Sequence, residues 1–151
     1  MQNHYNLVYR EEEREMNPYC TKTGVALMPW SPLARGTLTG SYKGGFAGGA
    51  TDRSRGGDRV RTEGLYRGAA TFDIADRVSE VAEKYEKAPA QIALAWLVNK
   101  PGITSPVVGV SKIEQLDQLV EATDITLADE DVAYLEELYQ PLENLLSIGT
   151  S

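Results

Sequence analysis

The sequence predicts an α/β protein that forms a single domain over residues 1–151, with about three parallel strand-and-helix units. Three short segments, residues 1–8, 24–29 and 105–110, have the composition of strands, and a predicted helix follows each of them in the sequence. This alternation is typical of a parallel sheet, because parallel strands need a crossover connection that is usually a helix.

Composition and charge limit the class of protein. The 151 residues are 42% hydrophobic and 25% charged, which is ordinary for a globular domain with its own core. The formal net charge of −7 argues against a nucleic-acid partner, which needs a basic surface. Cys20 is the single cysteine, so no intrachain disulfide forms and packing is its expected role. The sequence shows no membrane-spanning run, no leader and no metal site, so we expect a cytoplasmic protein.

The first predicted strand, residues 1–8, has mixed polarity. The period of two places one set of side chains on one face, Gln2, His4 and Asn6, and another on the opposite face, Asn3, Tyr5 and Leu7. Amides at a strand end indicate a rim that faces a ligand or solvent. His4 has no carboxylate or cysteine spaced near it, so we expect a hydrogen-bonded strand residue rather than a catalytic base.

Residues 9–23 are predicted to form a helix with a charged, solvated surface. Arg10 and Arg14 lie within helical reach of Glu13 and Glu11, and the run carries no catalytic signal. Gly24 has the position of a glycine that ends a helix, and the apolar strand begins directly after it.

Residues 36–71 differ in composition from the rest of the chain. Glycine pairs separate the arginines at 53, 55, 59, 61 and 67, and apolar residues are few, which is typical of a long loop. Such a loop is either a functional lid or a surface insertion, and no phosphate-loop spacing such as G-x-x-x-x-G-K is present.

The C-terminal half has three further helix signals. Residues 72–85 have the periodicity of an amphipathic helix, and Pro89 fits the first turn of a helix to about residue 99 that is apolar on every side. Trp96 in that helix is expected to be core. A closing helix is expected after Thr126, with Asp129 as its capping carboxylate and with an apolar stripe of Val132, Leu135 and Leu138.

The strand at residues 105–110 is followed by an expected helix start. Ser111, with Glu114 three residues later, has the spacing of a capping box. First-turn amides and the positive charge of Lys112 together make an anion site at the carboxyl end of the strand. The alternative is an ordinary helix start without a ligand.

The motif W-S-P-L-A-R-G at residues 30–36, directly after the apolar strand, resembles the cofactor loop of the aldo-keto reductase family. The resemblance extends through residues 2–7, 10–15, 91–97 and 109–112, and is nearest to the branch of aryl-alcohol dehydrogenases and potassium-channel β-subunits. It implies an NADP(H)-dependent oxidoreductase that reduces aldehydes or ketones and folds as a (β/α)8 TIM barrel. The chain would be a truncated segment equivalent to the last three strand-helix units, with a tail at residues 143–151.

The resemblance also implies cofactor-binding residues. Gln2 would meet the nicotinamide carboxamide, unless it is only an exposed amide, and Lys112 would contact the 2′-phosphate. The implied set is Gln2, Trp30, Ser31, Pro32, Leu33, Arg35, Gly36, Gly109, Ser111, Lys112, Gln115 and Gln118. Leu119 departs from the family, which usually has an asparagine that contacts adenine at this position. Basic residues of the 36–71 loop would fold over the dinucleotide.

Catalytic residues are not assigned. The family uses a tyrosine acid with a lysine, an aspartate and a histidine, and all four precede the part of the barrel that this chain resembles. Three functions therefore stay open: part of a redox enzyme, a non-redox enzyme for cyclisation, dehydration or isomerisation, and a non-catalytic binding or regulatory module.

A homo-oligomer is also expected from the predicted sheet. Right-handed crossovers place all helices on one side of the sheet, so the other face, with alternate residues of 25–29 and 106–110, stays bare. A homodimer or a higher homo-oligomer would cover this face and the unpaired strand edges.

Overall fold

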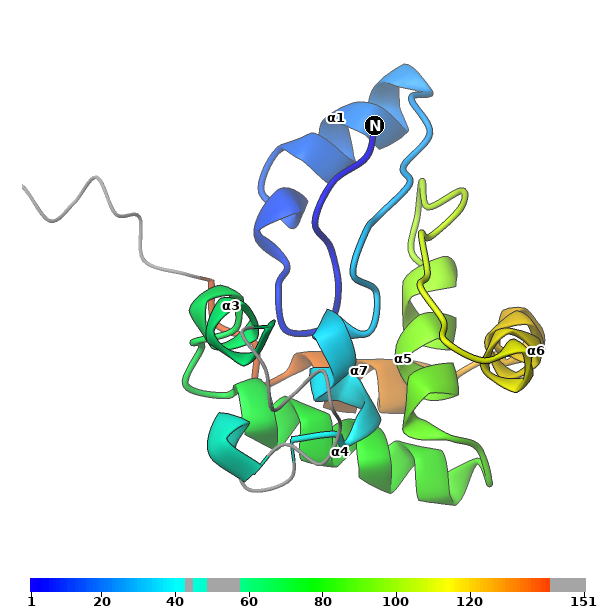
Figure 1. Cartoon of the computed structure of the whole chain (residues 1–151). Coiled ribbons are helices and arrows are strands. Elements are labelled where there is room, and N and C mark those ends of the chain that lie inside the picture. The colour runs from blue at the N-terminus through cyan, green and yellow to red at the C-terminus, as the bar shows by residue number, and fades with distance from the viewer. Residues whose placement is uncertain (43–44, 49–57, 142–151) are drawn as a thin grey trace, which may run out of the picture.

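A computed structural model describes residues 1–42, 45–48 and 58–141 (Figure 1). The α-helices in these ranges are α1 (Met16–Thr23), α3 (Asp58–Leu65), α4 (Thr71–Lys84), α5 (Pro89–Val98), α6 (Ile113–Glu121) and α7 (Asp129–Glu136). The 3₁₀ turns are η1 (Glu11–Glu13), η2 (Ala34–Thr39), η3 (Phe46–Gly48) and η4 (Ala122–Asp124). No helix in the described part of the chain is long and apolar enough to cross a membrane.

The three predicted strands are extended segments that lie side by side and parallel. Isolated parallel bridges join His4 to Trp30, Trp30 to Val107 and Leu27 to Ile103, which fixes the order of the segments as first, second, third. Backbone hydrogen bonds support this register, for example from the Trp30 amide to the Asn3 carbonyl at 2.8 Å. The prediction of regular strands is wrong for the described residues, which hold only isolated bridges. Prolines at positions 29 and 106 contribute to this, because proline has no N–H to donate to a ladder.

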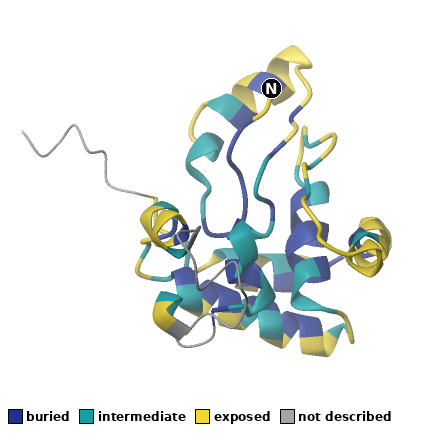
Figure 2. Ribbon diagram, viewed as in Figure 1, coloured by how far each residue is buried: buried dark blue, intermediate teal, exposed yellow. Residues whose placement is uncertain are grey.

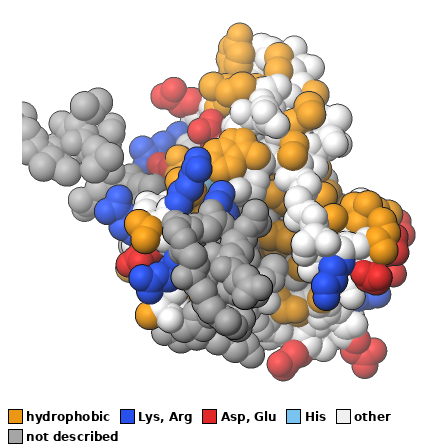
Figure 3. Space-filling view, in the orientation of Figure 1, with side chains coloured by type: hydrophobic (Ala, Val, Ile, Leu, Met, Phe, Trp, Pro, Cys, Tyr) orange, Lys and Arg blue, Asp and Glu red, His pale blue; other side chains and the backbone are white. Residues whose placement is uncertain are grey.

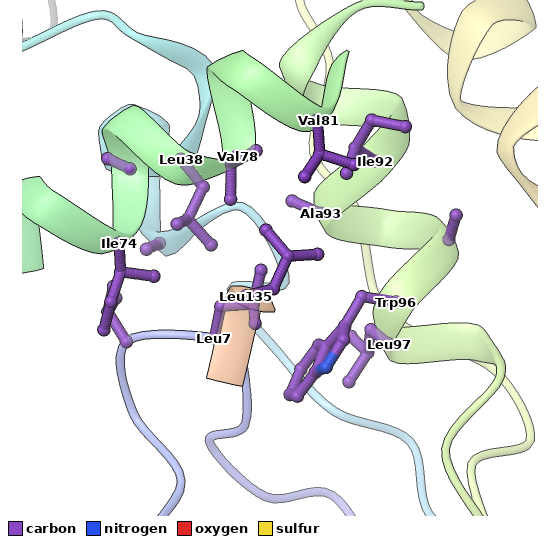
Figure 4. Close-up of a cluster of buried hydrophobic side chains, with 14 of the residues drawn as sticks. Leu7, Leu38, Ile74, Val78, Val81, Ile92, Ala93, Trp96, Leu97 and Leu135 are labelled. Atoms are coloured by element: carbon purple, nitrogen blue, oxygen red, sulfur yellow. The ribbon is translucent and has the colours of Figure 1, made fainter. Parts of the chain in front are cut away.

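The helical half of the fold is close to the prediction. α4 buries the stripe that includes Ile74, Val78 and Val81, and α5 is buried on all sides from residue 91 to residue 97. These helices meet Leu7 from the first segment and Leu135 from α7 in one core (Figure 4), and Trp96 is only 2% exposed there, as expected. Figure 2 shows the buried positions concentrated in the first extended segment and on α4 and α5, whereas α6 is largely exposed.

The charged run at residues 9–23 differs from its prediction. The α-helix begins only at Met16, after the 3₁₀ turn η1, and the expected pairs Arg10–Glu13 and Arg14–Glu11 do form. Arg10 is not on a solvated face, because its side chain is 12% exposed and also pairs with Glu136 of α7 at 3.0 Å. Arg10 and Glu136 are more than 120 residues apart in the sequence, so local sequence patterns could not predict this contact.

The described part of residues 36–71 is more ordered than a loop. It contains α3 as well as buried residues of the core, among them Leu38, Tyr42 and Tyr66. The arginines at 53 and 55, two of those expected to fold over a dinucleotide, lie outside the described residues. Single aromatic and apolar residues spaced widely among glycines form no periodic pattern, so sequence reasoning missed these core positions.

The expected closing helix is present as α7, but it begins at Asp129 rather than directly after Thr126, and no side chain caps it. Asp131 instead accepts hydrogen bonds from Lys84 at 2.8 Å and from the Tyr85 hydroxyl at 2.7 Å, which ties α7 to the end of α4. The expected capping role of Asp129 is therefore wrong.

Gly24 ends α1 with φ 72°, and its amide donates to the Cys20 carbonyl, as predicted for a C-terminal glycine. We expect Gly24→Ala to lower the free energy of unfolding by about 1 kcal/mol, because a side chain disfavours this left-handed conformation. The matched control is Gly64→Ala in α3, where a Cβ meets nothing within 4 Å and φ is not left-handed. That variant should be neutral or more stable by up to about 1 kcal/mol. Urea unfolding measures both, and equal effects would contradict the prediction.

Candidate functional site

A cleft of about 710 Å³ lies where the second and third extended segments end. Its walls come from the loop after the second segment, from the end of the third segment and from the start of α6. The lining residues are Trp30, Ser31, Pro32, Leu33, Arg35, Gly36, Thr39, Ser41, Val107, Val108, Gly109, Val110, Ser111 and Gln115. The carboxyl ends of parallel strands are the usual place for ligands in α/β proteins.

The loop at residues 31–36 has an unusual backbone. Ser31, Ala34 and Arg35 have φ values of 53°, 47° and 54°, and Gly36 follows with φ 97°. Non-glycine residues in this region cluster at functional sites, where the surrounding structure compensates the strain. Here Ala34 is fully buried, and the Asn6 side chain donates to the Ser31 carbonyl at 2.9 Å. The loop is thereby held in one shape with Arg35 at the cleft.

The start of α6 is capped by Gln115, which the sequence pattern did not indicate as a capping residue. Gln115 Oε1 accepts from the Ser111 amide at 3.0 Å, from the Ser111 hydroxyl at 3.2 Å and from the Lys112 amide at 3.2 Å. Helix α6 begins at Ile113, so the expected capping box of Ser111 with Glu114 is wrong. Lys112 stands at the N-cap position instead, and the side chain of Gln115, three residues later, accepts from its amide.

Nine of the twelve predicted cofactor residues line this cleft. The three that do not are Gln2, Lys112 and Gln118, all of which are exposed. Sequence reasoning missed Thr39, Ser41, Val107, Val108 and Val110. The hydroxyls of Thr39 and Ser41 are 2.8 Å apart, and Thr39 donates to the Gly36 carbonyl. Leu119 faces inward, 6% exposed, and packs with Leu94 and Ala122.

Among the arginines of residues 36–71 that the structure describes, none lines the cleft. Arg67, for example, donates to the Gly64 carbonyl at 3.3 Å. The cationic side chains at or near the cleft are instead Arg35 in its wall and Lys112 at the start of α6.

A buried polar cluster lies behind Trp30. His4 and Asn6 share a face, as predicted, and both approach the hydroxyl of Tyr66, which is 2.8 Å from His4 Nε2. Burial lowers the pKa of His4 from 6.5 to about 4, so the imidazole is neutral at pH 7. Burial also raises the pKa of Tyr66 to about 12, against the effect of its hydrogen bonds with Asn6 and Ser31. Neither group has a pKa near 7, where proton transfer at neutral pH is most effective. His4 is hydrogen-bonded to Tyr66, as expected for a strand residue of this kind.

The cleft combines an aromatic ring, several hydroxyls, an arginine and a helix N-terminus. This donor set suits a ligand with a flat ring and phosphate groups, and the volume is in the range of roughly 300 to 1,000 Å³ that is typical of small-molecule sites. Within the described ranges, no group of three or more His, Cys, Asp or Glu side chains could hold a metal ion.

Fold and cleft thus define an α/β protein with a cleft at the carboxyl ends of its parallel extended segments. The sequence model of the aldo/keto reductase family matches residues 1–140, and the chain belongs to this family.

Individual proteins are also similar to this chain. A Schizosaccharomyces pombe protein named as an aryl-alcohol dehydrogenase is 49% identical over 142 residues, which are 94% of this chain and 38% of that protein. The versiconal hemiacetal acetate reductase of Aspergillus parasiticus is 39% identical over 148 residues, covering 93% of this chain and 40% of that reductase.

A solved structure is also similar. The crystal structure of a thermostable aldo-keto reductase in complex with the inhibitor epalrestat has a TM-score of 0.63 and 26% sequence identity, and the match covers 91% of this chain and 38% of that one. The chain therefore spans about two fifths of the length of the relatives that it matches.

Proposed function

We propose that this chain forms the NADP(H)-binding part of an oxidoreductase that reduces aldehydes or ketones, equivalent to the last three units of a (β/α)8 barrel. The observation that carries the proposal is the cleft, because the W-S-P-L-A-R-G loop and the start of α6 meet in it although about 75 residues separate them in the sequence. Family membership supplies the redox chemistry: when bound, the reduced nicotinamide donates a hydride to a carbonyl carbon.

Each part of the cleft has a distinct task in this proposal. Trp30 offers an aromatic face to the nicotinamide. Gln2 lies on the face of the first segment that also carries His4, the bridge partner of Trp30. Arg35 and the hydroxyls of Thr39 and Ser41 are suited to the pyrophosphate. Ser111, Lys112 and Gln115 surround the start of α6, where amides and a positive charge favour a 2′-phosphate. Gly109 has open space around its Cα, so the ligand can approach the backbone closely.

We expect NADPH to bind more tightly than NADH. The test is a titration with both nucleotides that follows tryptophan emission, with a Trp30→Phe variant to subtract the signal of Trp96. Lys112→Ala should weaken NADPH about tenfold, roughly the free energy of one charged hydrogen bond, and leave NADH unchanged. Lys87→Ala, an exposed lysine away from the cleft, is the matched control. Lack of any response at millimolar nucleotide, or unchanged NADPH binding by Lys112→Ala, would reject the proposed site.

We also expect a protein of residues 1–151 to form a homodimer or a higher oligomer. Met28 and Val107, on the face of Trp30, are 42% and 41% exposed, whereas Leu27 on the opposite face is fully buried. Figure 3 shows hydrophobic side chains on the surface of the extended segments and of α6, where Ile113 is 64% exposed. Covering apolar surface gains about 25 cal/mol per Å², which favours association with a second copy.

Size exclusion with light scattering measures the mass. Met28→Lys should shift the equilibrium toward monomer, because it places a charge on the bare face. Tyr19→Lys, at a position on α1 that is 62% exposed and lies outside this face, should leave the mass unchanged. A wild-type chain that stays a folded monomer of 16.6 kDa at micromolar concentration would contradict the expectation.

A further inference from the structure

Trp30 is one end of an aromatic stack of three rings, in which His4 is the middle ring. The His4 imidazole lies 4.0 Å from the indole with an angle of 11° between the planes, and Tyr9 lies 4.1 Å from the other face of His4 at 16°. The stack runs across the parallel bridge between His4 and Trp30. Since His4 covers one face of the indole, only the other face can meet a ligand in the cleft that Trp30 lines.

Hydrogen bonds fix the orientation of the imidazole in this stack. Nε2 is 2.8 Å from the Tyr66 hydroxyl and 3.3 Å from the Asn6 side-chain nitrogen. An amide NH₂ can only donate, so Nε2 accepts and the neutral ring carries its proton on Nδ1. Tyr66 is 1% exposed and meets the imidazole edge-on, with ring centres 5.5 Å apart. The ring of His4 therefore cannot turn without breaking a buried hydrogen bond.

We propose that His4 is a positioning residue for the ligand: held by Tyr66 and Asn6, it sets the plane of Trp30 so that the free indole face receives a flat, electron-poor ring. The proposal rests on the proposed function, in which this ring is the nicotinamide of NADP(H). Stacked aromatic pairs prefer parallel offset arrangements, so a ring that continues the stack gains from an indole whose plane is fixed beforehand. Asn6 contributes twice, since it also holds the Ser31 carbonyl in the loop that follows Trp30.

The first test does not need a ligand. His4 is the single histidine, so its imidazole gives one set of NMR signals. We expect the Nδ1–H tautomer at pH 7 from the ring ¹⁵N shifts, and ring protons shifted upfield by the aromatic rings on both faces. Trp30→Leu should move these protons downfield. The Nε2–H tautomer, or proton shifts of a solvent-exposed histidine, would overturn the proposal.

The second test separates positioning from a purely structural role. His4→Ala should weaken NADPH binding by about three- to tenfold, the range expected from one aromatic pair, whereas His4→Phe keeps a ring in the stack and should restore the affinity to within about twofold. Tyr66→Phe keeps its ring but frees the imidazole, and should weaken binding less than His4→Ala. Urea unfolding of each variant shows which are folded, and the affinity comparison uses those.

Outcomes for this inference and for the proposed function are distinguishable. If the wild-type chain binds neither NADPH nor NADH, the proposed function fails and the positioning role fails with it. If the wild-type chain binds NADPH and His4→Ala binds it equally well, or His4→Phe binds no better than His4→Ala, only the inference about His4 is overturned.

Discussion

Replacing Glu136 by alanine is expected to lower the free energy of unfolding by about 2–4 kcal/mol, because it leaves several partly buried donors without their acceptor. The Glu136 carboxylate accepts from Trp96 Nε1 at 2.7 Å, from the Lys100 ammonium and from Arg10 at 3.0 Å. These partners come from the residue before η1, from α5 and from the turn after α5, so one side chain on α7 joins distant parts of the chain.

The neighbouring residue provides the control. Glu137 is the C-cap residue of α7 and also pairs with an arginine, Arg77, at 2.7 Å. Its side chain, however, is 67% exposed. Glu137→Ala should therefore cost less than about 1 kcal/mol. Urea unfolding of the two variants at pH 7 measures the difference, and similar losses at both positions would contradict the importance of the Glu136 network.

The same network should appear in the pH dependence of stability. Burial raises the pKa of the Glu136 carboxyl, but hydrogen bonds from Lys100 and Trp96 together with the charge of Arg10 outweigh it, so the pKa lies below its ordinary value of 4.5. The folded state then holds this proton less tightly than the unfolded state. The stabilisation is present above the ordinary pKa and is lost as the pH falls through the folded value. Glu136→Gln should lose less stability on acidification than the wild-type chain does.

A protein of residues 1–151 by itself is expected to reduce an aromatic aldehyde with NADPH at least about 100-fold more slowly than a full-length member of the family. A tuned proton donor within reach contributes about 10² to 10⁴ in rate. Tyr66 contacts His4, which stacks on the cleft residue Trp30, yet Tyr66 is 1% exposed, its pKa is raised to about 12, and its hydroxyl is hydrogen-bonded to His4. It is therefore not placed to protonate a carbonyl oxygen.

The assay follows NADPH absorbance and the aldehyde product together. Robust turnover would contradict the expectation, and a Tyr66→Phe variant would then show whether Tyr66 is the acid after all. A new product without NADPH oxidation would favour the non-redox enzyme. Nucleotide binding with no product would favour a binding or regulatory module.

The sequence by itself determined the features that depend on neighbouring residues. The periodicity of residues 72–85 predicts α4 and its buried Ile74 and Val78, and the all-apolar run after Pro89 predicts the buried helix α5. Gly24 marks the end of α1 because a left-handed residue is needed at that point. The alternation in residues 1–8 also places His4 and Asn6 on one face. Much of the cleft could be predicted too, but through the family motif rather than from periodicity.

Only the tertiary structure decided which distant groups meet. The register between the extended segments sets His4 against Trp30, and the return of the chain after α3 brings Tyr66 to within 2.8 Å of His4. The contact of Arg10 with Glu136 is of the same kind. Such contacts are chosen by packing and by the need to pair buried polar groups, and these free energies depend on the whole fold rather than on any local stretch of the sequence.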